Sequence, residues 1–278
     1  MDNMTSFTVS LAGIGIRFEF PFETEIPTEF RPFLAPDAPV QASYRAELHQ
    51  QFCPSGEPVC EQSQQTIYRT ERGWLRLFSS GIGVELTPEG ENVIHFQVEE
   101  SRRYRRNYTI SPLLGMEYVL AHRERLLLHS SAVLYQGAAI LFSGPSGVGK
   151  STQADLWHQY AGAEVINGDR CVISRSDGGY VAHGSPFCGS SGIRRQVSAP
   201  LGAVIFLEQG QENRLQPVSC WDAYRRLYSQ IIVNSWDEDY TKRVCSLIEG
   251  MINGIPMYVY YCRADASAVE FLKNALNA

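Results

Sequence analysis

One short stretch of the chain combines several glycines, a lysine and two hydroxyl residues directly after the lysine. It reads FSGPSGVGKST and covers residues 142–152. Glycines let successive backbone N–H groups point inward around phosphate oxygens, and a helix that follows adds the positive end of its dipole. The pattern G-x-x-x-x-G-K-[ST] of phosphate-binding loops is matched in full by Gly144, Pro145, Ser146, Gly147, Val148, Gly149, Lys150 and Ser151.

Two side chains at the end of this loop have distinct expected roles. Lys150 is expected to reach the terminal phosphates of a bound nucleotide, and the hydroxyl of Ser151 is expected to ligate magnesium. We place Thr152, the next residue, with the phosphate-binding residues. The alternative is a glycine-rich turn without a ligand, but the pattern lies between an expected strand and an expected helix, as phosphate binding requires.

A carboxylate follows the loop at close range. Asp169 comes 19 residues after Lys150, just beyond the short apolar stretch EVIN. One helix and one return strand separate the two residues, so the chain can bring Asp169 beside the γ-phosphate. There the carboxylate can bind magnesium or accept the proton of an attacking hydroxyl. The alternative is an ordinary turn aspartate in the sequence NGDR.

Further candidates surround this carboxylate in the sequence. Arg170 is expected to keep the neighbouring Asp169 ionised. The glycine-rich segment HGSPFCGSSGIRR, residues 183–195, can approach a substrate closely. Within it Arg194 or Arg195 can neutralise charge in a transition state, and an exposed arginine pair is the alternative. Cys188 lacks a His/Asn partner motif, which argues against a nucleophilic role.

The elements around the loop must place these residues. Two apolar runs, residues 132–134 and 138–142, are joined by Tyr135-Gln136-Gly137 and predict a hairpin whose second arm leads into the loop. The loop is followed by a predicted helix over residues 151–160 and the strand EVIN. This part continues with a buried strand GAVIFLE, a helix that Ser219 caps and a helix over DYTKRVCSLIEGMI. The acidic WDEDY is expected to cap that helix, with attraction of a cationic substrate as the alternative. A strand PMYVYYC and a helix over residues 265–276 complete the chain.

The first hundred residues predict β-structure. Phe7, Val9 and Leu11 alternate with polar residues, and the same alternation returns over residues 14–20. The five prolines of residues 21–39 predict a connection, after which strands resume at TIYRT, GWLRLF, GVELT and NVIHFQVE, with a hairpin turn at TPEGEN. We expect an antiparallel meander. The arginine-rich SRRYRRNY then predicts an edge strand or an anionic-ligand site, and residues 112–125 predict a helix.

Composition limits the class of protein. The chain has 278 residues, a net charge of −6 and 19% charged residues. These values favour a folded globular chain and do not favour nucleic-acid binding. Seven cysteines, an odd number without a CxxC pair, favour reduced thiols and a cytoplasmic location. We find neither a signal peptide nor an apolar run of the roughly 20 residues that a bilayer requires, so no membrane association is expected.

The segment LLHSSAVLYQGAAILFSGPSGVGKST, followed by VINGDR, carries a family resemblance. It resembles the catalytic domain of HPr kinase/phosphorylase and its ATP-type phosphoenolpyruvate carboxykinase relatives. It is most similar to the HPr-kinase-like serine kinases of bacteria, some of which act on ribosomally made peptides. The resemblance implies a mixed α/β fold, with a P-loop catalytic domain over residues 126–278 and a β-rich region over residues 1–125 that could recognise the substrate.

The resemblance also implies an activity. Its donor would be ATP with Mg²⁺, and its acceptor a serine or threonine hydroxyl of a protein or peptide. Ser151 and Asp169 would hold the metal, Lys150 the phosphates, and Asp169 would also be the catalytic base. His129 matches a histidine that orients a phosphate or the base, with a buried histidine bonded to backbone as the alternative. Oligomers occur in the resembling family, so an oligomer is compatible with this assignment.

Two departures from the family point away from HPr as substrate and from phosphorolysis. Gly168 stands where the family has a second acidic residue, and SSGIRR is at best a degenerate copy of the later RG(V/L)GI signature. The loop, Asp169 and the resemblance together still lead us to expect an ATP-dependent phosphotransferase. The alternatives are a non-catalytic ATP-binding accessory protein of a peptide-modification system and a carboxykinase-type metabolic phosphotransferase.

Overall fold

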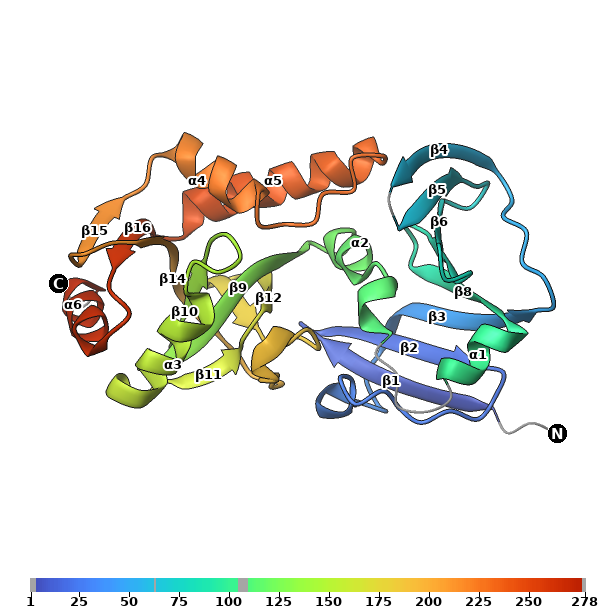
Figure 1. Ribbon diagram of the computed structural model, residues 1–278, viewed down its shortest axis with the longest axis horizontal. Helices are drawn as coiled ribbons and strands as arrows, with labels where there is room; N and C mark the ends of the chain where they lie inside the picture. Colours follow the sequence, from blue (N-terminus) through green and yellow to red (C-terminus); the bar gives the residue numbers. More distant parts are fainter. Residues whose placement is uncertain (1–3, 63, 105–109, 277–278) are drawn as a thin grey trace. The chain divides into compact units, whose positions relative to one another are not determined.

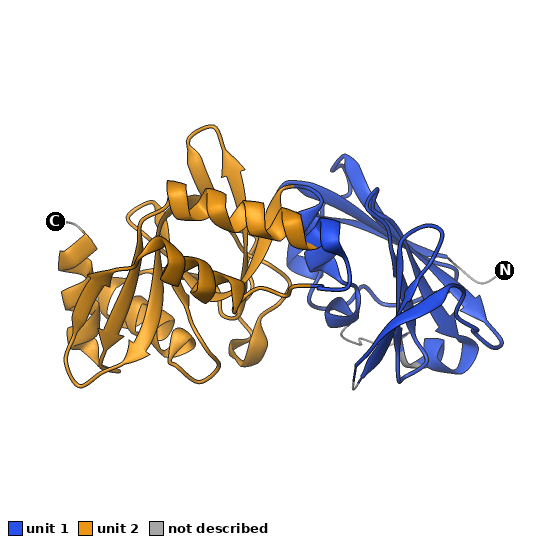
Figure 2. Ribbon diagram, turned by 90° about the horizontal axis from the view of Figure 1, so that it is seen from above, with its two compact units in different colours: residues 1–123, 234–240 blue, residues 124–233, 241–278 orange. Residues whose placement is uncertain are grey.

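The chain divides into two compact units. The computed structural model describes residues 4–62, 64–104 and 110–276. Unit 1 comprises Met1–Arg123 and Asn234–Tyr240, and unit 2 comprises Glu124–Val233 and Thr241–Ala278 (Figure 2). The expected boundary after residue 125 lies beside this division. The return of residues 234–240 to unit 1 was not expected.

Unit 1 is built on one sheet of eight strands (Figure 1). Its spatial order is β1-β2-β3-β8-β7-β6-β5-β4. The strands β8 to β4 form an antiparallel meander, as expected, and β7 and β8 are joined by the predicted TPEGEN turn. The strands are β1 (Thr5–Leu11), β2 (Ile14–Phe20), β3 (Val40–His49), β4 (Glu57–Gln62), β5 (Gln65–Arg69), β6 (Trp74–Phe78), β7 (Gly83–Leu86) and β8 (Glu91–Gln97).

The expectation of an entirely antiparallel sheet was wrong. β3 pairs in parallel with both β2 and β8, so it joins the β1–β2 hairpin to the meander. The strand β3 was not predicted from the sequence, although Ala42, Tyr44 and Ala46 are buried and alternate with more exposed residues. Two of these three buried residues are alanines, whose weak apolar signal hides the period of two that marks a strand.

The helical part of unit 1 also differs from the expectation. Residues 101–104 of SRRYRRNY belong to the helix α1 (Val98–Tyr104) and not to an edge strand, and residues 105–109 lie outside the described residues. The expected helix over residues 112–125 is a short 3-10 helix, Ser111–Leu113, followed by α2 (Met116–Ala121). Gly115 between them has φ of 61°, a left-handed conformation that ends the first helix.

The returning segment 234–240 is held in unit 1 by buried side chains. Tyr118 donates a hydrogen bond of 2.8 Å to Asp237 Oδ2 and stacks on Tyr240 at 5.3 Å. Asp237 Oδ1 accepts from the Tyr240 backbone N–H at 3.0 Å, near the start of α5 (Glu238–Gly254). The acidic WDEDY segment therefore caps a helix, as expected.

Unit 2 is built on a second sheet, in which the two long strands β9 and β14 each pair with three other strands. β9 pairs through its first half with β12 and through its second half with β10 and β11. β14 pairs first with β13 and then with β10 and β16. The pairings β10–β9–β12–β13–β14–β10 therefore form a closed circuit. The strands are β9 (Arg125–Tyr135), β10 (Ala138–Ser143), β11 (Glu164–Asn167), β12 (Arg170–Ser176), β13 (Gly179–His183), β14 (Ser198–Gln209), β15 (Arg214–Pro217) and β16 (Met257–Cys262).

The predicted hairpin before the glycine-rich loop is confirmed. Tyr135 pairs with Ala138 across a two-residue turn. Gln136 and Gly137 have φ of 49° and 84°, the positive values that a tight hairpin turn favours. The first arm begins at Arg125, well before the expected residue 132, because its N-terminal half pairs with β12.

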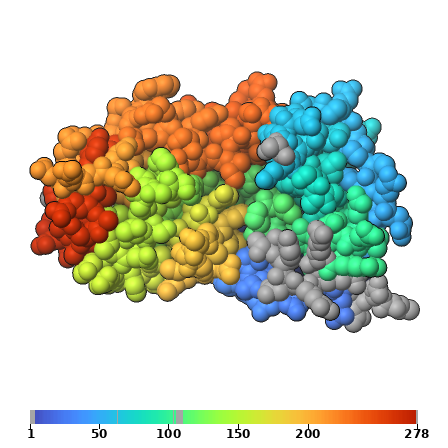
Figure 3. Space-filling model, viewed as in Figure 1, coloured from blue at the N-terminus to red at the C-terminus, as the bar shows by residue number. Residues whose placement is uncertain are grey.

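Helices cover the core of unit 2. α3 (Lys150–Ala161) and α6 (Ala266–Leu276) pack together, and in the space-filling view their yellow-green and red residues lie close to each other (Figure 3). They share a core that includes Trp157, Leu272, Phe142 and Ile205. Ser219 caps α4 (Cys220–Tyr228) by accepting from the Asp222 N–H at 3.2 Å, as expected. Among the described residues, no helix combines the length and the apolar character needed to span a membrane.

Candidate active site

The glycine-rich loop connects β10 to α3, as its sequence predicts. Gly144, Gly147 and Gly149 have φ of 147°, 80° and 113°, values that other residues adopt only with strain. A Cβ atom would meet nothing within 4 Å at Gly147 or Gly149. The conformation of the loop, and not crowding, therefore requires glycine at these two positions.

Lys150 places its ammonium group inside the loop. The residue is only 7% exposed, and its Nζ donates to the carbonyl oxygens of Gly144 at 2.9 Å and Pro145 at 3.1 Å. Burial lowers the pKa of Lys150, and the nearby carboxylate of Asp169 opposes that shift. Ser131 of β9 donates to the Lys150 carbonyl at 2.7 Å and fixes the start of the helix. A buried cation within a glycine loop suits a phosphate group.

The two hydroxyls after Lys150 lie in different surroundings. Ser151 Oγ donates to the carbonyl of Gly168 at 3.4 Å, which brings the first turn of α3 against the residue before Asp169. Thr152 lines a cavity of about 680 Å³ together with the loop and with Gln209, Cys262 and Arg263 at the ends of β14 and β16. Cavities of this size commonly hold small ligands.

Asn167 fixes the backbone around Asp169. Its Oδ1 accepts from the backbone N–H groups of Asp169 and Arg170, both at 2.8 Å. Its Nδ2 donates to the carbonyl oxygens of Ser185 at 3.0 Å and Phe187 at 2.8 Å, and the residue is fully buried. This role of Asn167 was not predicted from the sequence. An asparagine two residues before the carboxylate, where it can form an Asx turn, is the signal that could have found it.

The carboxylate of Asp169 lies between a histidine and an arginine side chain. His129 Nε2 is 3.5 Å from Oδ1, and Arg170 Nε is 3.5 Å from Oδ2. His129 and Arg170 are register partners on β9 and β12, so both flank the residue that precedes β12. The hydrogen bond from His129 lowers the pKa of Asp169 most, burial opposes it, and Arg170 and Lys150 lower it further. The carboxylate is therefore ionised at neutral pH, the form that can ligate a metal or accept a proton.

The segment after β13 runs beside this carboxylate. A Cβ added to Gly189 would lie 3.0 Å from the side chain of Asp169. A Cβ added to Gly168 would collide with the side chain of Ser191, so a second acidic residue at position 168 would displace the segment. The neighbours of the site therefore accommodate one carboxylate and leave little space for two.

The two arginines of this segment are held by other groups. Arg194 donates to Cys188 Sγ at 3.4 Å, and Arg195 is paired with Glu164. Arg170, in contrast, lies over the ring of Phe187 at 5.3 Å and contacts Asp169 as well. The structure thus brings together Lys150, Ser151, Asp169 and His129 of the predicted site. It places Arg194 on the flanking segment.

A second, smaller cavity also borders His129. It measures about 160 Å³ and is lined by Leu127, His129, Arg170 and the segment 229–232 that follows α4. The His129 backbone N–H donates to the Gln230 carbonyl at 2.9 Å, which holds this segment against β9. The cavity borders both partners of the Asp169 carboxylate.

Comparison with solved structures finds a slight likeness to a kinase among its matches. The HPr(Ser) kinase/phosphatase from Coxiella burnetii matches over 54% of this chain and 92% of its own, with a TM-score of 0.30 and 9% identity. These values carry no functional argument, so the kinship with HPr kinases stays a prediction. No curated protein matches the chain. A family model described as "SynChlorMet cassette protein ScmC" matches residues 106–266. Since that match spans more than half of the chain, the protein belongs to the ScmC family of SynChlorMet cassette proteins.

Proposed function

We propose that unit 2 binds ATP with Mg²⁺ and transfers the γ-phosphoryl group to a serine or threonine hydroxyl of a protein or peptide. One observation carries this proposal. The carboxylate of Asp169 lies between His129 and Arg170 beside the start of α3, its backbone is held by the buried Asn167, and Lys150 occupies the glycine-rich loop.

The donor side of the site consists of the loop and the first turn of α3. The loop N–H groups and Lys150 would hold the phosphates, with the ammonium exchanging its two carbonyl partners for phosphate oxygens. Ser151 and Asp169 offer the oxygen ligands that Mg²⁺ prefers. Bound Mg²⁺ would neutralise charge on the transferring phosphoryl group. The cavity of about 680 Å³ beside Thr152 would receive the nucleoside.

The acceptor side consists of Asp169 and its neighbours. The acceptor oxygen attacks the γ-phosphorus, the bond to the bridging β–γ oxygen breaks, and ADP leaves with that oxygen. Asp169 takes the proton of the hydroxyl, and His129 positions the carboxylate. The small cavity next to His129, with Leu127 and Ile231 in its wall, offers an apolar contact for the chain that carries the acceptor.

The test is phosphotransfer by the full-length protein. It is incubated with Mg²⁺, labelled ATP and serine-containing peptides, including any short peptides encoded beside its gene, and products are detected by intact-mass spectrometry. Asp169→Asn should lower the rate by about 10²- to 10⁴-fold while ATP binding persists. Asp155→Asn, an exposed carboxylate on α3, is the matched control and should leave the rate unchanged. Unaltered transfer by Asp169→Asn would remove this residue from the mechanism.

A second candidate function is ATP binding in support of another enzyme. The observation that favours it is the single carboxylate, because Gly168 is packed against Ser191 where the resembling kinases have a second acid. The description of the family as a cassette protein is compatible with such a role. This reading predicts ATP binding and no phosphorylated product with any acceptor, so the same mass measurement separates the two functions.

A further inference from the structure

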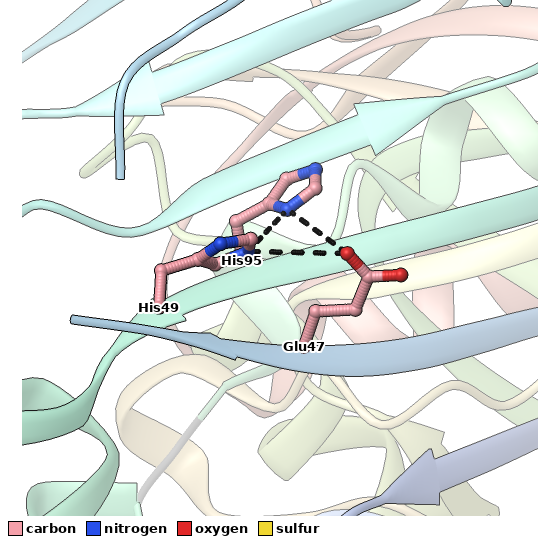
Figure 4. Close-up of side chains that lie close together, drawn as sticks. All are labelled: Glu47, His49 and His95. Atoms are coloured by element: carbon pink, nitrogen blue, oxygen red, sulfur yellow. Dashed lines mark hydrogen bonds and ion pairs between the residues drawn. The ribbon is translucent and has the colours of Figure 1, made fainter. Parts of the chain in front are cut away.

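Three potential metal ligands converge on one face of the sheet of unit 1. Glu47 and His49 are two residues apart on β3, so their side chains point to the same face. His95 is the register partner of Glu47 on the neighbouring parallel strand β8. Figure 4 shows the three side chains turned toward one another.

The spacing of the three donor atoms suits a single ion. His49 Nε2 and His95 Nδ1 are 3.1 Å apart, and Glu47 Oε2 lies 3.9 Å from the first and 3.8 Å from the second. A tetrahedral ion with bonds of about 2.0–2.1 Å to its ligands keeps the donor atoms about 3.3 Å apart. Small side-chain movements would bring all three atoms to that spacing.

Hydrogen bonding within the protein does not account for this arrangement. The two ring nitrogens can share one proton, but both carboxylate contacts are longer than a hydrogen bond. The second oxygen of the same carboxylate, Oε1, is already bound to Arg45 at 3.0 Å. Oε2 is thus the oxygen that faces the histidines, at a distance that an intervening ion would bridge.

Neighbouring groups fix the two rings and leave an opening. Phe52 stacks on His95 with the ring centroids 4.4 Å apart and 14° between the planes, and it also contacts His49. The side chains of Glu47, His49 and His95 are 38%, 29% and 13% exposed, so an ion and a water ligand can enter.

We propose that Glu47, His49 and His95 form a Zn²⁺ site, with solvent in the remaining position. Two imidazoles and one carboxylate form a ligand set typical of zinc, whereas Mg²⁺ and Ca²⁺ prefer oxygen ligands alone. β3 and β8 are the parallel pair that joins the β1–β3 part of the sheet to the β8–β4 part. The ion would therefore cross-link the two parts of unit 1. This site is independent of the function proposed for unit 2.

The experiment is a calorimetric titration of the full-length, reduced and chelator-treated protein with Zn²⁺, without nucleotide. We expect one equivalent of Zn²⁺ to bind, unaffected by millimolar Mg²⁺. His49→Gln, His95→Gln and Glu47→Gln should each weaken binding at least about 100-fold, because even outer partners of metal ligands contribute 10- to 100-fold. His158→Gln, an exposed histidine on α3, is the control and should bind as the wild type does.

Cobalt gives a second measurement that separates this site from the seven free cysteines. Co²⁺ in the proposed site should show ligand-field absorption without a thiolate charge-transfer band, and the His49→Gln variant should lose it. A wild-type protein that binds no Zn²⁺, or binding that shows thiolate absorption and survives all three substitutions, would overturn the proposal. Should the histidine variants fail to fold, Glu47→Gln, at a partly exposed position, decides alone.

Discussion

The pKa of Asp169 is lowered more by a histidine on a neighbouring strand than by the arginine next to it in sequence. The hydrogen bond from His129 is the largest cause of its lowered pKa, ahead of the charge of Arg170. From the sequence, Arg170 was predicted to keep Asp169 ionised, because it is the next residue in the chain. The contact with His129 depends on the pairing of β9 with β12 and becomes visible only in the fold.

We expect His129→Ala to raise the pKa of Asp169 toward its ordinary value, because the main stabiliser of the carboxylate is lost. The acid limb of the kcat/KM profile for phosphotransfer should therefore move to higher pH. His129→Gln, whose amide can still donate, should recover part of the shift. The pH dependence of the rate measures this, with His158→Gln as the control. An acid limb that stays in place in His129→Ala would show that His129 does not set the ionisation of Asp169.

Functional residues that act within one short segment could be predicted from the sequence. Contacts that depend on which strands pair, and in which register, could not. The loop, Lys150 and Ser151 could be identified because their pattern follows from backbone geometry within a few residues. Asn167 has a local signal in its turn toward Asp169 and Arg170, but its bonds to Ser185 and Phe187 depend on a segment that only the fold brings beside it. Arg194 was predicted from its charge and its glycine-rich segment, and in the structure its partner is the thiol of Cys188.

At the scale of elements, one histidine ties three strands of unit 2 together. His183 of β13 contacts Ser174 of β12 at 2.8 Å and Ser198 of β14 at 2.7 Å through its two ring nitrogens. Burial, and to a smaller degree the charge of Arg125, lowers the pKa of His183 to about 4. The ring is therefore neutral in the folded protein at pH values where the unfolded chain already binds a proton.

Unit 2 should lose stability as the pH falls from about 6.5, the ordinary histidine pKa, toward the folded pKa of about 4. In that interval the unfolded state holds more protons, so this group lowers the free energy of unfolding by at most about 1.4 kcal/mol per pH unit. Above pH 6.5 the contribution is complete. Urea unfolding at several pH values checks this.

His183→Asn should flatten the pH dependence at some cost in stability at pH 7, while the exposed His158→Gln should leave the slope as it is. An equally steep slope in His183→Asn would assign the dependence to other groups.

The elements themselves were predictable where their signal was strong and local. The hairpin before the loop, the cap at Ser219 and the meander of unit 1 followed from turn residues and alternation. β3 was not predicted, because the two alanines on its buried face give only a weak apolar alternation. The parallel pairing of β3 could not be predicted, because the sequence contains no signal for which strand lies beside another one distant in the chain.

At the scale of the molecule, the two proposed ligands belong to different units. ATP with Mg²⁺ at about 100 times its Kd should stabilise unit 2 by about 2.7 kcal/mol, since it binds the folded site alone. Zn²⁺ should stabilise unit 1. Hydrogen exchange in moderate denaturant, followed by mass spectrometry of peptides from each unit, measures both effects.

The Lys150→Ala variant should lose the response to ATP and keep the response to Zn²⁺. Glu47→Gln should lose the response to Zn²⁺ and keep the response to ATP. Equal protection of both units by either ligand would contradict the assignment of one ligand to each unit.

The return of residues 234–240 to unit 1 has a consequence for synthesis on the ribosome. Tyr118 cannot meet Asp237 or Tyr240 until all of Glu124–Val233 has been translated, because that stretch precedes them in the chain. Unit 1 is begun first and yet is completed only after most of unit 2 has emerged. A nascent chain that stalls before residue 237 would leave the tyrosine of α2 without its closing partners, and it would be a substrate for chaperones and proteases.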